Sequence, residues 1–316
     1  MTDPSTALYL GIDLGSTKTA AGVWRLDSPA MSPRRLARTE WPTPAGGPRP
    51  SLDLMAREGQ RLLDEVRARD GGEIAAVGIS GGGPVDPQAG RILSIPNLKG
   101  WNDVPITRIL GDRFPAPVLL ENDANACALA EWKYGAGRGS RNLAFLTCST
   151  GIGAGLILDG RLIRGASSLA GEVGHLEIVP GGLLCGCGRR GCLEAYASGA
   201  GMAARLERLR ADDPSLPRTA REVVERARRG DEFSRTFLRE TAGYLASGLA
   251  HLIFCVNPER IILGTIAASA GEDLLEPLRA ALQGRVWPAL LSGLEVVPSA
   301  LWPDLGDYAA LAVACP

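Results

Sequence analysis

Residues 169–198 read LAGEVGHLEIVPGGLLCGCGRRGCLEAYAS, and this stretch constrains the rest of the chain more than any other. One of the two histidines and three of the seven cysteines lie in it: His175, Cys185, Cys187 and Cys192. Three thiolates and one imidazole form the ligand set of a closed tetrahedral zinc site. Glu172 and Glu194 flank the four residues. The stretch therefore predicts a zinc-stapled loop that presents carboxylates to a ligand.

The composition is that of an ordinary globular protein. A chain of 316 residues is long enough for two domains, and 45% hydrophobic and 22% charged residues are typical values. A net charge of -1 gives no electrostatic reason to expect nucleic acid or an anionic membrane as partner. No apolar run approaches the ~20 residues of a membrane helix, and the first residues lack the pattern of a secretory signal. We expect a cytoplasmic protein whose cysteines are reduced and available for metal.

A second informative stretch lies near the N-terminus, where two apolar runs flank a polar turn. Residues 8–14 and 20–24 predict the strands of a hairpin, not the strand–turn–helix of a P-loop. The turn consists of Gly15, Ser16, Thr17, Lys18 and Thr19. Its amides and hydroxyls suit phosphate oxygens, and Asp13 at the end of the first strand suits an associated Mg²⁺. On these residues alone a plain hairpin turn is the simpler interpretation.

The same pattern recurs in the second half of the chain. Residues 142–147 predict a strand, STGIGAG at 149–155 is a glycine-rich bend, and 156–158 predict the returning strand. The candidates for phosphate contact in this bend are Thr150, Gly151 and Gly153. Two such hairpins, each opening a β-rich half of the chain, predict a duplicated α/β unit with a phosphate chain held between the copies.

Helices and strands alternate in the region between the hairpins. Residues 29–50 carry six prolines and predict irregular surface chain. Residues 51–69 predict an amphipathic helix with Ser51 as its N-cap. A buried strand at 74–80 runs into the loop GGGPVD at 81–86, where a ligand could approach the backbone closely.

Three polar residues further on are candidates for substrate contact. Asn102 lies in a predicted loop at 95–102. Residues 117–121 predict a strand, and Asn122 and Asp123 then begin a helix. The dipole at a helix N-terminus favours an ionised Asp123 carboxylate, although N-cap is an equally simple role for this residue.

The C-terminal part is predicted to be mainly helical. Helices are expected at 199–210, 219–229, 231–256, 272–282 and 304–314, with strands at 260–264 and 295–298. The last helix is expected to pack against the N-terminal domain. His251, in an apolar helix, is interpreted as a core or interface residue. The other cysteines are interpreted as small core residues or incidental thiols: Cys127, Cys148, Cys255 and Cys315.

These motifs resemble the ROK family (repressors, uncharacterised reading frames and sugar kinases) of the actin-like ATPase superfamily, over nearly the whole chain. The resemblance rests on DLGST at 13–17, ENDANA at 121–126, STGIGAG at 149–155, GEVGH at 171–175 and CGCGRRGCLE at 185–194. It implies an α/β fold with two actin-like, ribonuclease H-like ATPase domains around a hinged cleft. The expected domains are a smaller one, 1–120 plus the C-terminal helix 302–316, and a larger one, 121–301, that carries the zinc loop.

The resemblance also implies an ATP-dependent sugar kinase that phosphorylates a hexose, usually at O6. Asp123 matches the general base that accepts the proton of the attacking hydroxyl. The implied sugar-binding positions are Gly82, Gly83, Asn102, Asn122, Asp123, Glu172, His175 and Glu194. The implied nucleotide and Mg²⁺ positions are Asp13, Gly15, Ser16, Thr17, Lys18, Thr19, Thr150, Gly151, Gly153, Gly264 and Thr265. His175 would serve both the structural zinc and the sugar.

The chain departs from the family pattern near the adenine. The run Leu263-Gly264-Thr265-Ile266 replaces a glycine-rich segment, which leaves open weaker ATP binding or another phosphoryl donor such as polyphosphate. Ser16 and Ser149 each replace a glycine of the family, and both are small changes.

Other functions remain to be weighed against a kinase. A sugar-responsive repressor would need a DNA-binding domain, for which the seven residues before the first strand leave no room. A non-catalytic sugar-binding protein is disfavoured by Asp123 and the two phosphate turns. Glucose is the expected substrate from its frequency in the family, and N-acetylmannosamine or N-acetylglucosamine is the alternative. The family further suggests a homodimer, and we expect no nucleic-acid or membrane partner.

Overall fold

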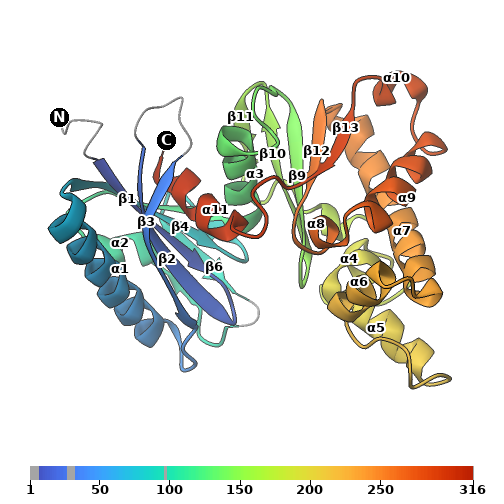
Figure 1. The fold of residues 1–316 in the computed structure, drawn as a ribbon, viewed down its shortest axis with the longest axis horizontal. Helices are drawn as coiled ribbons and strands as arrows, with labels where there is room; N and C mark the ends of the chain where they lie inside the picture. Colours follow the sequence, from blue (N-terminus) through green and yellow to red (C-terminus); the bar gives the residue numbers. More distant parts are fainter. Residues whose placement is uncertain (1–6, 27–32, 96–97, 316) are drawn as a thin grey trace. The chain divides into compact units, whose positions relative to one another are not determined.

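The computed structural model of the chain describes residues 7–26, 33–95 and 98–315. The chain divides into two compact units (Figure 1). Unit 1 consists of residues 1–135, 164–169 and 303–316, and unit 2 of residues 136–163 and 170–302. Each unit combines a mixed sheet with helices and has a hydrophobic core of its own, which confirms the predicted α/β class.

The main sheet of unit 1 has the strand order β3-β2-β1-β4-β8. The strands are β1 (Ala7–Leu14), β2 (Lys18–Arg25), β3 (Arg34–Pro42), β4 (Glu73–Gly81) and β8 (Val118–Asn122). β1, β2 and β3 are antiparallel neighbours, whereas β1, β4 and β8 are parallel. A small side sheet joins β5 (Val85–Asp86), β6 (Arg91–Ser94) and β7 (Asn102–Val104). The parallel strands bring the ends of β1, β4 and β8 to one edge of the sheet.

Helices cover both faces of this sheet (Figure 1). They are α1 (Pro48–Asp70), α2 (Ile106–Gly111), α3 (Asp123–Tyr134) and α11 (Leu305–Ala314). Leu10 points to the α1 face, where it lies against Gly59, and the adjacent Gly11 faces α11. Gly11 pairs with Gly78 on β4, and a Cβ at Gly78 would collide with the α11 backbone. Two paired glycines thus let α11 sit directly on the sheet.

The sheet of unit 2 repeats this plan with the order β11-β10-β9-β12-β13. Its strands are β9 (Leu143–Cys148), β10 (Ile152–Leu158), β11 (Arg161–Ile163), β12 (Arg260–Leu263) and β13 (Glu295–Pro298). The first three in sequence are antiparallel neighbours, and β9, β12 and β13 are parallel. Order and direction match those of unit 1 strand for strand, in agreement with the duplication predicted from the two hairpins.

The remaining elements of unit 2 are mostly helical. They are η2 (Val173–His175), α4 (Glu194–Ala197), α5 (Gly199–Arg210), α6 (Ala220–Arg228), α7 (Glu232–Val256), α8 (Thr265–Ala270), α9 (Glu272–Gln283) and α10 (Pro288–Leu291). The long helix α7 packs against α9 and α6, and its buried face supplies much of the core. The segment 164–198, by contrast, contains the predicted zinc loop and has little regular structure.

Two predictions for residues 29–69 are wrong. The proline-rich region was expected to be irregular, but β3 occupies Arg34–Pro42; residues 29–32 lie outside the described residues. A strand is possible because none of the six prolines lies within residues 34–41. In addition, β3 is an edge strand of the sheet. Helix α1 begins at Pro48 and not after Ser51, because proline is well suited to the first helical turn.

The sequence-based domain boundary at 120/121 falls within β8. Strand β8 is hydrogen-bonded to β4, and α3 packs against α11, so residues up to Gly135 belong to unit 1. Residues 164–169 return to unit 1, whereas the predicted boundaries placed them in the larger domain. Helix α11 also belongs to unit 1, where it contacts β1 and β4.

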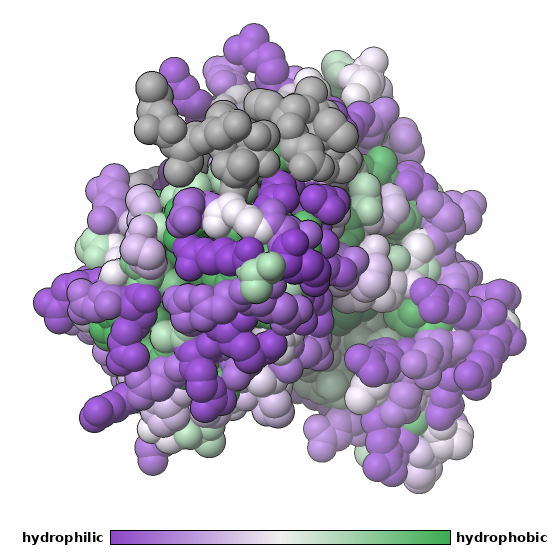
Figure 2. Space-filling model, turned by 60° about the vertical axis from the view of Figure 1, so that its left-hand side comes forward, coloured by the Kyte–Doolittle hydropathy of each residue, from purple (hydrophilic) through white to green (hydrophobic). Residues whose placement is uncertain are grey.

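The surface is predominantly hydrophilic on the face that Figure 2 shows, with apolar side chains in small groups between polar ones. Among the described residues, no helix combines the length and hydropathy needed to span a lipid bilayer.

Candidate functional site

Two carboxylates of unit 1 lie at the ends of parallel strands. Asp13 is near the end of β1, opposite Ser80 on β4, and Asp123 follows β8 as the first residue of α3. The carboxyl ends of parallel strands are the usual binding edge of such sheets. The Asn122 side chain caps α3 by accepting the N–H groups of Ala124 and Asn125, at 3.0 and 3.3 Å. The N-cap residue is therefore Asn122, and Asp123 is the first helical residue, where its Oδ1 also accepts the Ala124 N–H at 2.8 Å.

The environment of Asp13 strongly favours its protonated form. The side chain is partly buried, and its pKa is raised to about 7, with desolvation as the largest cause. The negative charges of Asp123 and Asp307 add to this, whereas Lys18 and a hydrogen bond from Ser80 oppose it. A Cβ at Gly306 in α11 would collide with the carboxylate, so the helix start lies directly on it. Such a carboxylate is stabilised by a cation, as the sequence-based Mg²⁺ position requires.

The first predicted phosphate-binding turn is a tight hairpin that a hydrogen bond from Thr43 stabilises. Gly15 N–H bonds to Lys18 O at 3.1 Å, and the Thr43 hydroxyl donates to Gly15 O at 2.7 Å. Ser16 and Thr17 are exposed at the tip. The other two candidates of the turn are engaged elsewhere: Thr19 is buried with its hydroxyl 2.9 Å from that of Thr43, and Lys18 pairs with Glu40 at 3.3 Å. Thr19 thus supports the turn rather than lining it.

Several predicted sugar-binding residues of unit 1 do lie together. Asn122 Nδ2 donates to Gly83 O at 3.1 Å, and a Cβ at Gly82 would lie 3.6 Å from Asp123 Oδ2. Gly83 has φ of +84° and packs against the Ser94 carbonyl, which explains why glycine occupies this position. Ser94 pairs in turn with Asn102, which is exposed at the start of β7. The glycine loop, the side sheet and the start of α3 therefore form one continuous surface.

An ion pair between the buried Glu121 and the partly exposed Arg164 supports this surface, and no role in the site was predicted for it. Glu121 is 2% exposed, and its Oε2 lies 2.7 Å from both Nε and Nη2 of Arg164. Its Oε1 accepts the Asn122 N–H at 3.1 Å and Asn125 Nδ2 at 3.0 Å. A charged residue at the end of a buried strand is a signal, since such a carboxylate needs partners. Nothing in the sequence indicates that Arg164, 43 residues away, is its partner.

The second predicted phosphate-binding turn lies in unit 2 between β9 and β10. Ser149 N–H bonds to Gly151 O at 3.0 Å and closes the turn. Thr265, in a left-handed conformation with φ of 51°, accepts the Cys148 N–H at 3.0 Å through its hydroxyl. The Gly264 N–H bonds to Leu146 O at 2.9 Å. Thr150, Gly151, Gly264 and Thr265 are thus gathered at the ends of β9 and β12.

The four predicted metal ligands are brought together. The sulfur atoms and a ring nitrogen of His175, Cys185, Cys187 and Cys192 all lie within 4.8 Å of one another. The Sγ atoms of Cys187 and Cys192 are 3.8 Å apart, and so are Cys185 Sγ and His175 Nδ1. Zn–S bonds of about 2.3 Å in a tetrahedron place two sulfurs about 3.8 Å apart. Burial, together with the neighbouring thiols of Cys187 and Cys192, raises the pKa of Cys185 to about 12, so three thiolates here need the charge of a cation. Geometry and chemistry therefore fit zinc.

The carboxylates beside this cluster have different surroundings. Glu172 is exposed, with Oε2 3.9 Å from His175 Nε2, the ring nitrogen that does not face the sulfurs. Glu194 Oε2 accepts the Ile152 N–H at 2.9 Å, so this side chain contacts the second phosphate turn. The two glutamates flank the metal cluster as predicted, but one is open to solvent and the other is engaged.

The histidine and the cysteines that the sequence predicted to be core or incidental residues differ in how deeply they are buried. His251 is exposed, with Nδ1 2.8 Å from Ser247 O, so a core position is wrong. Cys148 and Cys315 are buried, Cys127 is half-buried and Cys255 is exposed.

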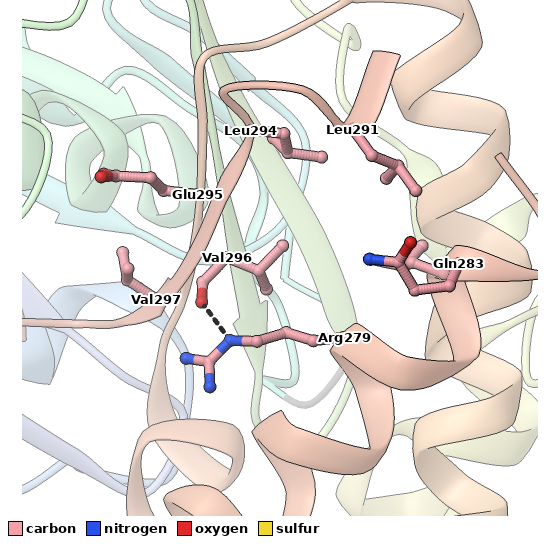
Figure 3. A pocket seen from close by; sticks show the side chains of 8 residues that line it. Arg279, Gln283, Leu291, Leu294, Glu295, Val296 and Val297 are labelled. Carbon is pink, nitrogen blue, oxygen red and sulfur yellow. Dashed lines mark hydrogen bonds between the residues drawn. The ribbon is translucent and has the colours of Figure 1, made fainter. Parts of the chain in front are cut away.

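A surface cavity of about 370 Å³ lies apart from these residues, between α9, α10 and β13 (Figure 3). Its walls are mainly aliphatic, and Arg279 at its edge donates to Val296 O at 2.9 Å. None of the predicted site residues lines it.

Two α/β units of identical strand order, each with a glycine-bearing hairpin turn, define an actin-like ATPase fold. A family model described as the ROK family matches residues 9–310. A glucokinase of Thermotoga maritima is 33% identical over 314 residues, covering 96% of each chain. The structure of a ROK family glucokinase from Streptomyces griseus in complex with glucose and AMPPNP is 31% identical, with a TM-score of 0.79 and coverage of 97% of this chain and 99% of that chain. A xylose repressor of Caldicellulosiruptor bescii is 34% identical over 237 residues, 72% of this chain and 59% of the repressor. The chain belongs to the ROK family, as its motifs indicated.

Proposed function

We propose that the protein is an ATP-dependent sugar kinase that phosphorylates a hexose at O6, with glucose as its substrate. The observation that carries the proposal is the pair Asp13 and Asp123 at the binding edge of one sheet, beside a hairpin turn suited to phosphate. The similarity to glucokinases from two other bacteria supports glucose in particular.

In the proposed mechanism Asp123 is the general base. It would accept the proton of the sugar hydroxyl as that oxygen attacks the γ-phosphorus of ATP, and ADP would leave. Its place at N1 of α3 lets the helix dipole favour the ionised form of the carboxylate. Asn122 is held by Glu121 and Gly83, so it can present a fixed amide to a neighbouring sugar hydroxyl. Glu172, His175 and Glu194 are the proposed sugar contacts from unit 2.

Two metal ions complete the proposal. Mg²⁺, held near Asp13, would neutralise charge on the phosphate groups. Zinc, held by His175, Cys185, Cys187 and Cys192, would be structural, because four protein ligands leave no open position. The turn residues Ser16, Thr17, Thr150 and Gly151 are the proposed phosphate contacts. A cytoplasmic location and a homodimer remain predictions.

A coupled assay of ADP release tests the proposal directly. The purified protein, with Mg²⁺ and ATP, is presented with a panel of glucose, mannose, fructose, N-acetylglucosamine and N-acetylmannosamine. We expect glucose to give the highest kcat/KM; a preference for N-acetylmannosamine would overturn the glucose assignment and leave the kinase intact. Polyphosphate is included as a second donor.

The variant Asp123→Asn tests the role of the base. We expect turnover to fall about 10²- to 10⁴-fold while sugar affinity changes little. Asp112→Asn, an exposed aspartate at the end of α2, is the matched control and should keep the rate of the wild type. If Asp123→Asn retains turnover, the assignment of the base is wrong.

A second candidate function is a sugar-responsive regulator, which the similarity to the xylose repressor favours. Such a protein would bind a sugar without consuming ATP. Sugar binding in calorimetry with no ADP release from any donor would favour this candidate over the kinase.

A further inference from the structure

Glu194 lies between the metal cluster and the second phosphate turn. One carboxylate oxygen, Oε2, accepts the Ile152 N–H at 2.9 Å, and the other, Oε1, lies 3.8 Å from Cys185 Sγ. A backbone N–H donated to a carboxylate is a strong, charge-assisted hydrogen bond. One side chain therefore contacts both a metal ligand and the strand that leaves the turn.

The packing around this contact leaves no spare room. A Cβ at Gly151 would lie 2.5 Å from Glu194 Oε2, and a Cβ at Gly174 would collide with Ile152 O. Gly174 immediately precedes the metal ligand His175. The metal loop thus approaches the turn from two sides, and glycine at 151 and 174 makes that approach possible.

The same segment holds the other side of the turn. Ser149 O accepts the Gly199 N–H at 2.7 Å, and Thr150 O accepts the Ala200 N–H at 3.2 Å. Both donors lie at the start of α5, a few residues after Glu194. The chain from Cys192 to Ala200 therefore begins at a metal ligand and holds the turn through a side chain and two amides.

This support leaves part of the turn available. Within the described part of the chain, the amides of Thr150 and Gly151 make no hydrogen bond, whereas those of Ser149 and Ile152 do. Adjacent free amides at a fixed bend form an anion-binding concavity. Their geometry depends on the bonds made by their neighbours.

We propose that Glu194 is a positioning residue for the Ser149–Gly155 turn, and that occupancy of the metal site sets the phosphate affinity of this turn through it. The proposal rests on the proposed function, because it assumes that ATP is the ligand of the turn. It gives Glu194 a role besides sugar contact, and it makes zinc part of the nucleotide site although zinc does not touch the nucleotide.

The first test measures binding of a fluorescent ATP analogue without sugar. We expect Glu194→Ala to weaken binding about tenfold, and Glu194→Gln, which keeps a neutral acceptor, by a smaller factor. Removing the metal from the wild type with a chelator should weaken binding about as much as Glu194→Ala. Because both changes act through one contact, metal removal should add little in the Glu194→Ala variant.

The matched control is Glu177→Ala. Glu177 is an exposed carboxylate of the same loop, and its Oε1 accepts the Gly181 N–H at 3.2 Å without contact to the turn. This variant should bind the analogue within about twofold of the wild type. Zinc content is measured for every variant, so that loss of metal and loss of Glu194 are distinguished.

The second test, hydrogen exchange at the Ile152 amide, does not need a nucleotide. We expect the exchange rate to rise at least about tenfold in Glu194→Ala and on metal removal from the wild type. Unchanged exchange, or effects of the variant and of metal removal that multiply independently, would overturn the proposal. Failure of the metal-loaded wild type to bind the analogue, with exchange behaving as expected, would instead refute the proposed function.

Discussion

Replacing Asp13 by asparagine should make unit 1 more stable at neutral pH while abolishing turnover. The pKa of the Asp13 carboxyl is raised from 3.8 to about 7, mainly by desolvation and then by Asp123 and Asp307. The folded protein therefore binds this proton more tightly than the unfolded chain. In the wild type, the resulting stabilisation is complete below about pH 4 and is lost as the pH rises to about 7.

The size of the effect follows from the shift. About three pKa units at about 1.4 kcal/mol each give about 4 kcal/mol between the two limits. Asparagine has nearly the shape of the protonated acid and does not ionise. The free energy of unfolding of Asp13→Asn should therefore match that of the wild type near pH 4 and exceed it by up to about 4 kcal/mol at pH 8.

Urea unfolding at several pH values, followed by tryptophan fluorescence, measures this difference. Trp24 and Trp101 are buried in unit 1 and report on it. The experiment is done without added Mg²⁺ and without nucleotide, since a cation at Asp13 would favour the ionised form. Asp112→Asn serves as the control. If the difference in unfolding free energy between the wild type and Asp13→Asn does not change with pH, the inference that the fold disfavours a charge on Asp13 is refuted.

Two further predictions concern the supports of the site. Metal analysis should find about one zinc per chain, and both Cys185→Ser and chelator treatment should remove it and lower the melting temperature by several degrees; full stability without metal would contradict a structural zinc. Arg164→Ala leaves the buried Glu121 carboxylate without its cation, and because Arg164 is partly exposed we expect a loss of about 1–3 kcal/mol with a fall in kcat. Adding Glu121→Gln should recover part of that stability, and no recovery in urea unfolding would show that the pair is not the cause.

Residues close together in sequence were the ones that the sequence predicted well. The four predicted metal ligands lie within 18 residues of one another in sequence, and the strand–turn–strand hairpins follow from local alternation and glycine. Strand β3 was missed because prolines were counted over a window, whereas their positions outside 34–41 permit a strand. The positions of the prolines, and not their number in the window, decide whether a strand can form there.

Contacts between distant segments could not be predicted in the same way. Glu121 and Arg164 meet only because residues 164–169 return to unit 1. The hydroxyl of Thr19 was predicted to contact phosphate, but in the structure it lies 2.9 Å from the hydroxyl of Thr43, the residue that follows β3. A residue type indicates what a side chain can do, and only the fold decides which partner it meets.

The duplicated topology also shows how the two turns differ. Asp13 pairs with Ala20 one position before the last pair of the first hairpin, and Thr147 pairs with Gly153 at the equivalent position of the second. One copy therefore carries a carboxylate where the other carries a hydroxyl. A carboxylate binds a cation more strongly than a neutral hydroxyl does, whereas backbone N–H groups bind the anion itself. If both turns bind one phosphate chain, the cation belongs to unit 1, beside the proposed base Asp123, and the turn of unit 2 must rely on the rigidity of its amides. That requirement gives a physical reason for supporting the second turn with Glu194 and a metal-stapled loop.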